Sequence, residues 1–209
     1  EGDIEMFYHN TGLMFDLAPK FRALIVFAEH RYYGQSLPMG DKSWTPDNIQ
    51  YLNSWQALAD YALLIPDFKR KYGMSMRAPV IVFGGSYGGM LSTYMRIKYP
   101  HIVDGAIASS APVTLFEGLA SPKAFNQIIT KDYADVLPNR QCSSWIQKAF
   151  LLVQSLGQST SGRNILSQRF SLCSPLKTQN DAYQLNSFLY NSIAYLAMLD
   201  YPYETDFLQ

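Results

Sequence analysis

The sequence has few of the residues that build metal centres and disulfide frameworks. Its 209 residues include 2 cysteines and 3 histidines. The cysteines form no CxxC motif, and His9, His30 and His101 lie far apart along the chain. Zinc sites and redox motifs need such groups at close spacing. We therefore predict neither a bound metal nor a cofactor.

Charge of one sign and long apolar runs are also lacking. The 17 basic side chains balance 17 acidic ones, so the charge gives no reason to expect contact with a nucleic-acid backbone. The longest uncharged stretches, 78–95 and 182–199, are interrupted by glycine, proline or polar residues. A membrane-spanning helix needs about 20 consecutive apolar residues. We predict neither a nucleic-acid partner nor a membrane partner.

An initiator methionine and a signal peptide are absent too. The chain begins with Glu1 and ends at Gln209. A signal peptide would show a charged start, an apolar stretch and a small-residue cleavage site. We interpret the chain as an internal piece of a longer protein.

Apolar material, by contrast, is plentiful. Hydrophobic residues make up 48% of the chain, which is enough for a sizeable core and excludes a disordered chain. In residues 1–112, strand-like and helix-like segments alternate, which predicts an α/β fold with a parallel sheet and right-handed crossovers. The expected strands are 23–28, 79–83 and 103–109, and the expected helices are 54–72 and 90–99.

Two details of the helix expected over 54–72 follow from single residues. Ser54 is its expected N-cap, because a serine hydroxyl can accept from an amide of the first turn. Pro66 is expected to kink or divide it, because proline lacks the amide hydrogen.

The pattern of apolar and polar residues changes after Pro112. Amphipathic helical patterns follow, separated by polar loops such as 157–162, and no run typical of a buried strand occurs. We predict two domains, an α/β core over 1–112 and a helical insertion, or cap, over 113–209. The helices expected in the second domain are 125–132, 144–156 and 181–199.

One motif carries chemistry. Residues 84–88 read Gly-Gly-Ser-Tyr-Gly and fit the pattern G-x-S-x-G directly between an expected strand and an expected helix. This is the setting of a nucleophile elbow, a strained turn that exposes a serine at the carboxyl edge of the sheet. We predict Ser86 as the nucleophile and the amide of Tyr87 as an oxyanion donor. Gly84 and Gly88 must then be small, so that strand and helix can approach.

Weaker interpretations of this motif remain open. The pattern alone occurs by chance in roughly 7% of chains of this length, given average glycine and serine usage. It could be a glycine-rich turn with an inert serine. A phosphate-binding P-loop would need the lysine of GxxxxGK[ST], which is missing here.

A serine nucleophile needs a base, and the sequence offers no good candidate. In this fold the acid and then the histidine follow the serine. His101 follows Ser86 but lies beyond the far end of the next helix, about 20 Å away at about 1.5 Å per residue. His30 follows an expected strand and could lie at the site, but it breaks the chain order. His9 has no supporting context. We expect the base and the acid to lie beyond Gln209.

Eight short motifs along the chain add a family resemblance. They are 1–4 (EGDI), 27–34 (FAEHRYYG), 56–60 (QALAD), 84–91 (GGSYGGML), 98–101 (KYPH), 110–112 (SAP), 173–176 (CSPL) and 200–203 (DYPY). Together they resemble the prolylcarboxypeptidase and dipeptidyl peptidase II family of serine exopeptidases, over essentially the whole chain.

The resemblance implies a partial α/β-hydrolase with a helical cap, lysosomal or secreted, that cleaves after proline or a small residue near a peptide end. Its substrate would be a proline-containing peptide, and its catalytic Asp and His would lie in a part that this chain lacks. The resemblance also implies that Met90 lines the proline pocket, although spacing alone makes it ordinary core. Glu1 and Gly2 stand where such folds supply a second oxyanion amide. A homodimer of the intact parent protein is a further expectation.

Two other functions stay open. An esterase or lipase would use the same elbow but expects an HGGG-type oxyanion loop, which is not found here. A truncated, non-catalytic form would act by binding alone.

Two pairs of residues also carry predictions. Glu29 and Arg31 are expected to form a structural ion pair rather than a catalytic one, because buried charges are usually paired. Cys142 and Cys173 are expected not to bond to each other, since the resemblance implies partners further along the parent chain.

Overall fold

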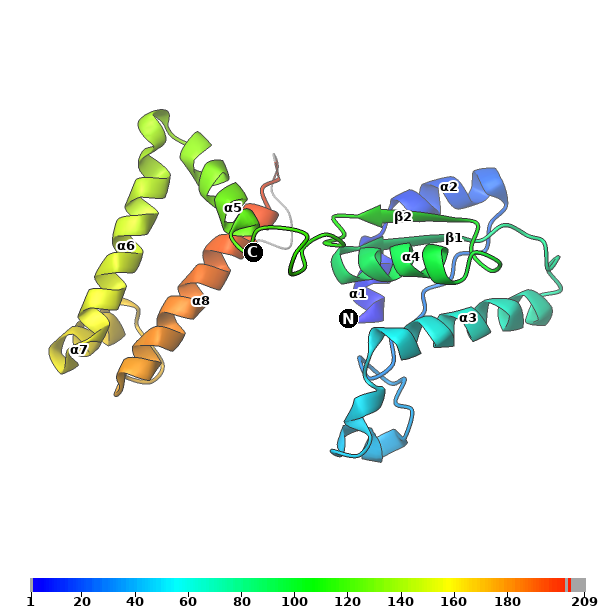
Figure 1. Cartoon of the computed structure of the whole chain (residues 1–209), viewed down its shortest axis with the longest axis horizontal. Helices are drawn as coiled ribbons and strands as arrows, with labels where there is room; N and C mark the ends of the chain where they lie inside the picture. The colour runs from blue at the N-terminus through cyan, green and yellow to red at the C-terminus, as the bar shows by residue number, and fades with distance from the viewer. Residues whose placement is uncertain (1, 202, 204–209) are drawn as a thin grey trace. The chain divides into compact units, whose positions relative to one another are not determined.

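The computed structural model describes residues 2–201 and 203 of the chain. These fall into two compact units, Glu1–Thr114 and Leu115–Gln209 (Figure 1). Each unit has its own hydrophobic core, so each is described by itself.

The first unit is a small parallel sheet flanked by helices, which confirms the predicted fold class. β1 and β2 pair in parallel, from Ile81 opposite Gly105 to Gly85 opposite Ser109, and α4 connects them and packs against both strands (Figure 1). The elements in chain order are α1 (Ile4–Asn10), α2 (Leu13–Phe21), the 3₁₀ turns η1 (Gly40–Trp44) and η2 (Ile49–Tyr51), α3 (Ser54–Lys71), β1 (Ile81–Gly85), α4 (Ser86–Lys98) and β2 (Gly105–Ser109).

The core of this unit lies where α3, α4 and the segment before β2 meet. Leu58 comes from α3, Leu91 and Met95 from α4, and Val103 from that segment, all nearly without solvent exposure. On α3 and α4 these residues belong to apolar stripes with helical spacing, which must bury against a neighbouring element. Packing of α3 on α4 is therefore what holds the strand-to-helix junction in place.

Two expectations about α3 do not hold as stated. The N-cap is Asn53, whose side chain accepts from the Gln56 amide at 3.0 Å, and Ser54 is already helical. Pro66 does not divide the helix, which runs unbroken from Ser54 to Lys71, and a kink at Pro66 stays a prediction. An interior proline costs about 3 kcal/mol, and burial of the helix on both sides of it, at Ala62 and Lys69, outweighs that cost.

The strand expected over 23–28 does not form within the described residues. The segment has no ladder partner there, and Leu24 and Val26 are 46% and 42% exposed. The expectation of a strand buried on both faces is therefore wrong. An apolar run shows that a segment prefers burial, but a strand also needs a neighbour to pair with.

The second unit is helical. It contains α5 (Ala124–Asp135), the short turn η3 (Pro138–Arg140), α6 (Gln141–Gly157), α7 (Thr160–Arg169) and α8 (Gln179–Met198). Helices expected over 125–132, 144–156 and 181–199 are confirmed as α5, α6 and α8. The sequence missed α7, which begins inside an expected loop with Ser159 as its N-cap. The core of the second unit is small and consists of Val153, Leu166 and Leu185.

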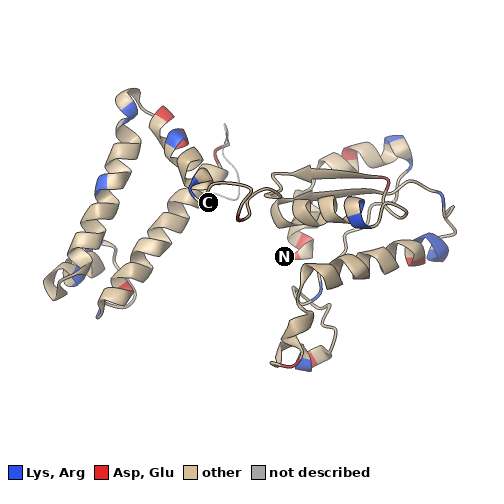
Figure 2. Ribbon diagram, viewed as in Figure 1, with Lys and Arg blue, Asp and Glu red and all other residues tan. Residues whose placement is uncertain are grey.

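The cysteines of this unit are not bonded to each other, as predicted. Cys142 is half-buried and Cys173 is exposed, and both thiols are free. In the described part of the chain, no helix is both long and apolar enough to cross a membrane. Figure 2 shows acidic and basic residues interspersed on the elements of both units.

Candidate active site

The predicted elbow is a direct junction of strand and helix. β1 ends at Gly85 and α4 begins at Ser86, with no residue between them. Ser86 is exposed and has a φ of 54°, a left-handed conformation that a serine rarely adopts. Strain of this kind persists only where the surroundings impose it, and it concentrates at functional sites. The serine hydroxyl is thus presented at the carboxyl end of a parallel strand, where ligands of such sheets bind.

The glycines around Ser86 do not share one role. A Cβ on Gly84 would lie 2.1 Å from the Gly88 carbonyl oxygen, so Gly84 must be small. A Cβ on Gly88 would meet no atom within 4 Å, so the expected steric need at Gly88 is not seen. Gly89, which the sequence analysis missed, is crowded instead, because its Cβ would lie 2.9 Å from Ala111 Cβ. The close approach is between the strand backbone and the helix backbone.

Tyr87 is the second residue of α4. Backbone amides at a helix N-terminus carry partial positive charge and point out of the helix end, so this amide faces the side on which Ser86 is presented. The Tyr87 ring packs against the core cluster of the first unit. Tyr61 packs against the same cluster, and burial raises the pKa of Tyr61 to about 12. The Tyr87 side chain is half-buried against this cluster.

His30 is brought to this tyrosine. Its side chain is only 4% exposed, and its Nε2 lies 3.1 Å from the Tyr87 hydroxyl. Its Nδ1 lies 2.7 Å from the Arg31 carbonyl oxygen, and its ring meets Tyr33 edge-on with centroids 4.9 Å apart. His30 thus contacts the residue that follows Ser86, while a role for it as the base stays untested. Apart from the place of His30 after an expected strand, no sequence pattern indicates this contact.

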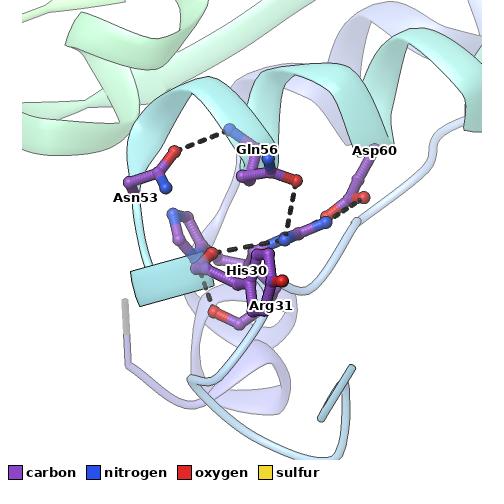
Figure 3. Close-up of polar contacts among 6 residues, drawn as sticks. His30, Arg31, Asn53, Gln56 and Asp60 are labelled. Carbon is purple, nitrogen blue, oxygen red and sulfur yellow. Dashed lines mark hydrogen bonds and ion pairs between the residues drawn. The ribbon is translucent and has the colours of Figure 1, made fainter. Parts of the chain in front are cut away.

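Arg31 anchors the same segment to α3 (Figure 3). Its guanidinium makes a two-pronged pair with Asp60, at 2.7 and 2.6 Å, which raises the pKa of Arg31. Its Nη1 also donates to Gln56 Oε1 at 3.1 Å and to the Tyr51 carbonyl oxygen at 3.2 Å. Bidentate pairs of this kind fix geometry as well as charge.

The expected ion pair between Glu29 and Arg31 is therefore wrong. The Glu29 carboxylate instead accepts from the Ser36 amide at 2.7 Å. Hydrogen bonding by the Ser36 side chain and amide holds the pKa of Glu29 below its ordinary value. Arg31 and Glu29 do not pair because each binds another residue. Arg31 binds Asp60 on α3, and Glu29 binds the Ser36 amide.

The other candidates are placed as follows. Met90 is half-buried one turn into α4, whereas the core cluster takes Leu91 and Met95 from that helix. Gly2 is exposed with a φ of 82°, and Glu1 lies outside the described residues. A second oxyanion amide at these two positions stays a prediction.

The remaining histidines lie at other places in the unit. His101 follows the far end of α4, whose 13 residues span about 20 Å. His9 lies in the last turn of α1 and contacts the Tyr8 ring. Among the described residues, no three His, Cys, Asp or Glu side chains gather as a metal ion would require.

Comparison with known proteins identifies a family match and several relatives of this chain. The serine carboxypeptidase S28 family matches it over residues 1–209. Human lysosomal Pro-X carboxypeptidase is 45% identical over 210 residues, covering 100% of this chain and 42% of that protein. Prolyl carboxy peptidase like protein 5 of Caenorhabditis elegans is 45% identical over 213 residues, covering 100% of this chain and 41% of that protein.

A more distant relative is the mouse thymus-specific serine protease, 33% identical over 172 residues, which cover 81% of this chain and 33% of that protein. The chain spans less than half the length of these relatives. The resemblance read from the short motifs is confirmed, and the chain belongs to the serine carboxypeptidase S28 family.

Proposed function

We propose that residues 1–209 are the nucleophile-bearing part of a lysosomal or secreted serine exopeptidase that cleaves after proline near a peptide end. One observation carries the proposal. Ser86 occupies a left-handed turn directly between β1 and α4, in a chain of a serine peptidase family. The names of the relatives support a Pro-X substrate and a lysosomal location.

The reaction follows from the elbow. Ser86 Oγ attacks the carbonyl carbon on the carboxyl side of proline while a base takes its proton. The oxygen of that carbonyl becomes an oxyanion, which the Tyr87 amide at the helix N-terminus stabilises. The amine leaves with a proton from the base, and water then releases the peptide from the acyl-enzyme on Ser86. Met90, half-buried one turn along α4, forms part of the proline pocket, where a flexible thioether suits a ring of fixed shape.

We infer that the base of this reaction is none of the three histidines of residues 1–209, and His9 lies in the last turn of α1. His101 follows the far end of α4. His30 has its Nδ1 on the Arg31 carbonyl oxygen and its Nε2 on the Tyr87 hydroxyl. We therefore place the base and its carboxylate in a part of the parent protein outside these residues. Residues 1–209 alone then bind without turnover, and the catalytic unit is the longer chain.

A fluorophosphonate probe tests the proposal. The full-length protein should be labelled, and Ser86→Ala should abolish both labelling and peptide hydrolysis while the protein stays folded. Residues 1–209 alone should hydrolyse prolyl peptides at least about a thousandfold more slowly, because a lost base costs a triad enzyme that much or more. Hydrolysis by Ser86→Ala above a few per cent of wild type would exclude Ser86 as the nucleophile. Parent-like turnover by the isolated residues would show that a base lies within them.

The same protein distinguishes two exopeptidase types. A carboxypeptidase cleaves a peptide whose N-terminus is blocked, whereas a dipeptidyl peptidase needs a free N-terminus two residues from the bond. Cleavage of a blocked prolyl peptide, with its free C-terminal residue released, is the result expected from the relatives' names. Cleavage only of a free-N-terminus dipeptidyl amide would assign the second type.

A further inference from the structure

The part-buried hydrogen bond between His30 and Tyr87 has no part in the reaction described above. It joins residues 57 positions apart, and the histidine is 4% exposed. We propose that His30 is a positioning residue that fixes the oxyanion amide through the Tyr87 hydroxyl. This role rests on the proposed function, since it needs Ser86 as nucleophile and the Tyr87 amide as oxyanion donor.

The direction of the hydrogen bonds follows from one acceptor. The Arg31 carbonyl oxygen can only accept, so His30 Nδ1 carries the hydrogen in the 2.7 Å contact. In the neutral ring, Nε2 then has its lone pair directed outward, and it accepts from the Tyr87 hydroxyl at 3.1 Å. The two bonds fix both the tautomer and the orientation of the ring.

The histidine is itself held firmly. Its neighbour Arg31 is fixed to α3 by the two-pronged pair with Asp60 and by the bond to Gln56 (Figure 3). α3 packs on α4 through Leu58 and Leu91. Tyr87 is thus held on two sides, by its own helix and by a segment tied to the next helix.

Holding Tyr87 matters because its amide belongs to the peptide unit that follows Ser86. The φ of 54° at Ser86 is strained, and relaxation of that turn would rotate this peptide and move the amide and the serine hydroxyl together. A side-chain bond that resists this rotation keeps the amide directed at the oxyanion. Because the oxyanion exists only after attack, losing the bond should lower kcat rather than raise KM.

The test uses single and double variants of the full-length protein. Tyr87→Phe keeps the ring and removes the hydroxyl, and His30→Phe removes the acceptor. One neutral hydrogen bond contributes enough for a three- to tenfold change in rate, by its usual range. We expect kcat for a prolyl peptide to fall by about that factor in each variant, with KM within about twofold. The double variant should fall no further than either single one, because both remove the same bond.

Two further variants make the result specific. His30→Gln keeps a polar atom near the tyrosine hydroxyl and should recover part of kcat. Tyr32→Phe is the matched control, since it also removes a buried tyrosine's hydrogen bond, the one to the Asn48 carbonyl oxygen at 2.5 Å. It should lower the melting temperature and leave kcat within about twofold of wild type, as expected for a bond that contributes to stability only.

The outcomes separate the two proposals. Wild-type kcat in Tyr87→Phe overturns the positioning role, and so does an additive loss in the double variant. If His30→Phe does not fold, Tyr87→Phe alone decides. Loss of activity in Ser86→Ala beside unchanged kcat in Tyr87→Phe overturns only the positioning role, whereas an active Ser86→Ala overturns the proposed function and this inference together.

Discussion

The two units use their charged side chains differently. In the first, Arg31 reaches Asp60, 29 positions away, and fixes the segment that contacts the elbow. In the second, charged groups bind partners that are near in the sequence. Lys131 pairs with Asp135 within α5, and Arg163 donates to the Gly157 carbonyl oxygen at the end of α6. The long-range pair of the first unit helps to hold the strained backbone at Ser86, and the local bonds of the second unit stabilise individual helices. Substitutions of Arg31 or Asp60 should therefore change the chemistry, whereas substitutions of Lys131, Asp135 or Arg163 should change only the stability.

The largest effect is expected where the first unit is most crowded. Gly84→Ala would place a Cβ 2.1 Å from the Gly88 carbonyl oxygen, so the strand or the helix must move. We expect a loss of about 3 kcal/mol or more in the free energy of unfolding. The measurement is chemical denaturation of the full-length protein.

Gly88→Ala is the matched control, because its added Cβ meets no atom within 4 Å. A helical Gly→Ala change at an unstrained position stabilises by about 0.5–1 kcal/mol. If Gly84→Ala and Gly88→Ala lowered the free energy of unfolding equally, the close approach at Gly84 would not be the reason for the loss.

An intermediate effect is expected at the proposed proline pocket. Met90→Trp should fill the pocket and lower kcat/KM for prolyl peptides about 10- to 100-fold, which is typical when a pocket loses its shape. Labelling of Ser86 by a small probe should persist. Met198→Trp makes the same change on a side chain that is 58% exposed in the second unit, and it should leave the kinetics unchanged. Wild-type kinetics in Met90→Trp would make Met90 an ordinary packing residue.

The smallest effect concerns a helix cap of the second unit. The Asp181 carboxylate accepts from the Thr178 and Lys177 amides, both at 2.8 Å, and these bonds lower the pKa of Asp181. Because the pKa of Asp181 is lower in the folded state than in the unfolded state, the cap stabilises α8 fully at a pH above the unfolded-state pKa. This stabilisation is lost as the pH falls through the folded-state pKa.

Asp181→Asn should therefore lower the melting temperature equally at about pH 7 and pH 5, and by less below about pH 4, near the ordinary pKa of an aspartate. Catalysis at pH 5 should not change. Asp132→Asn replaces an exposed carboxylate of α5 and should leave the melting temperature unchanged at each pH. A deficit in Asp181→Asn that does not vary with pH would contradict the role of the charge.

The sequence was most informative where structure is local. The junction at 84–88 and the helices α3 (Ser54–Lys71) and α8 (Gln179–Met198) follow from patterns within a few turns of chain. The segment 23–28 was misjudged because pairing depends on a distant neighbour that an apolar run does not specify. α7 was missed because its sequence is mostly polar and only a few residues, such as Leu166, are buried.

The candidate site divides in the same way. Gly84 could be identified from the motif because the close approach at the turn requires a glycine, and the position of Ser86 at the strand-to-helix junction follows from the same motif. The contacts of His30 with Tyr87 and of Arg31 with Asp60 join positions 57 and 29 residues apart. No local pattern encodes such a distance, and the nearer acid, Glu29, was the natural but wrong partner for Arg31.

Trapping the acyl-enzyme tests the central claim most directly. The full-length protein is mixed with an activated ester of an N-blocked dipeptide ending in proline, quenched in acid within one turnover, digested and mapped by mass spectrometry. The account predicts one adduct, with the mass of the prolyl acyl group, on the peptide that contains Ser86, and none in Ser86→Ala. An adduct on another residue, or turnover that continues in Ser86→Ala, would contradict it.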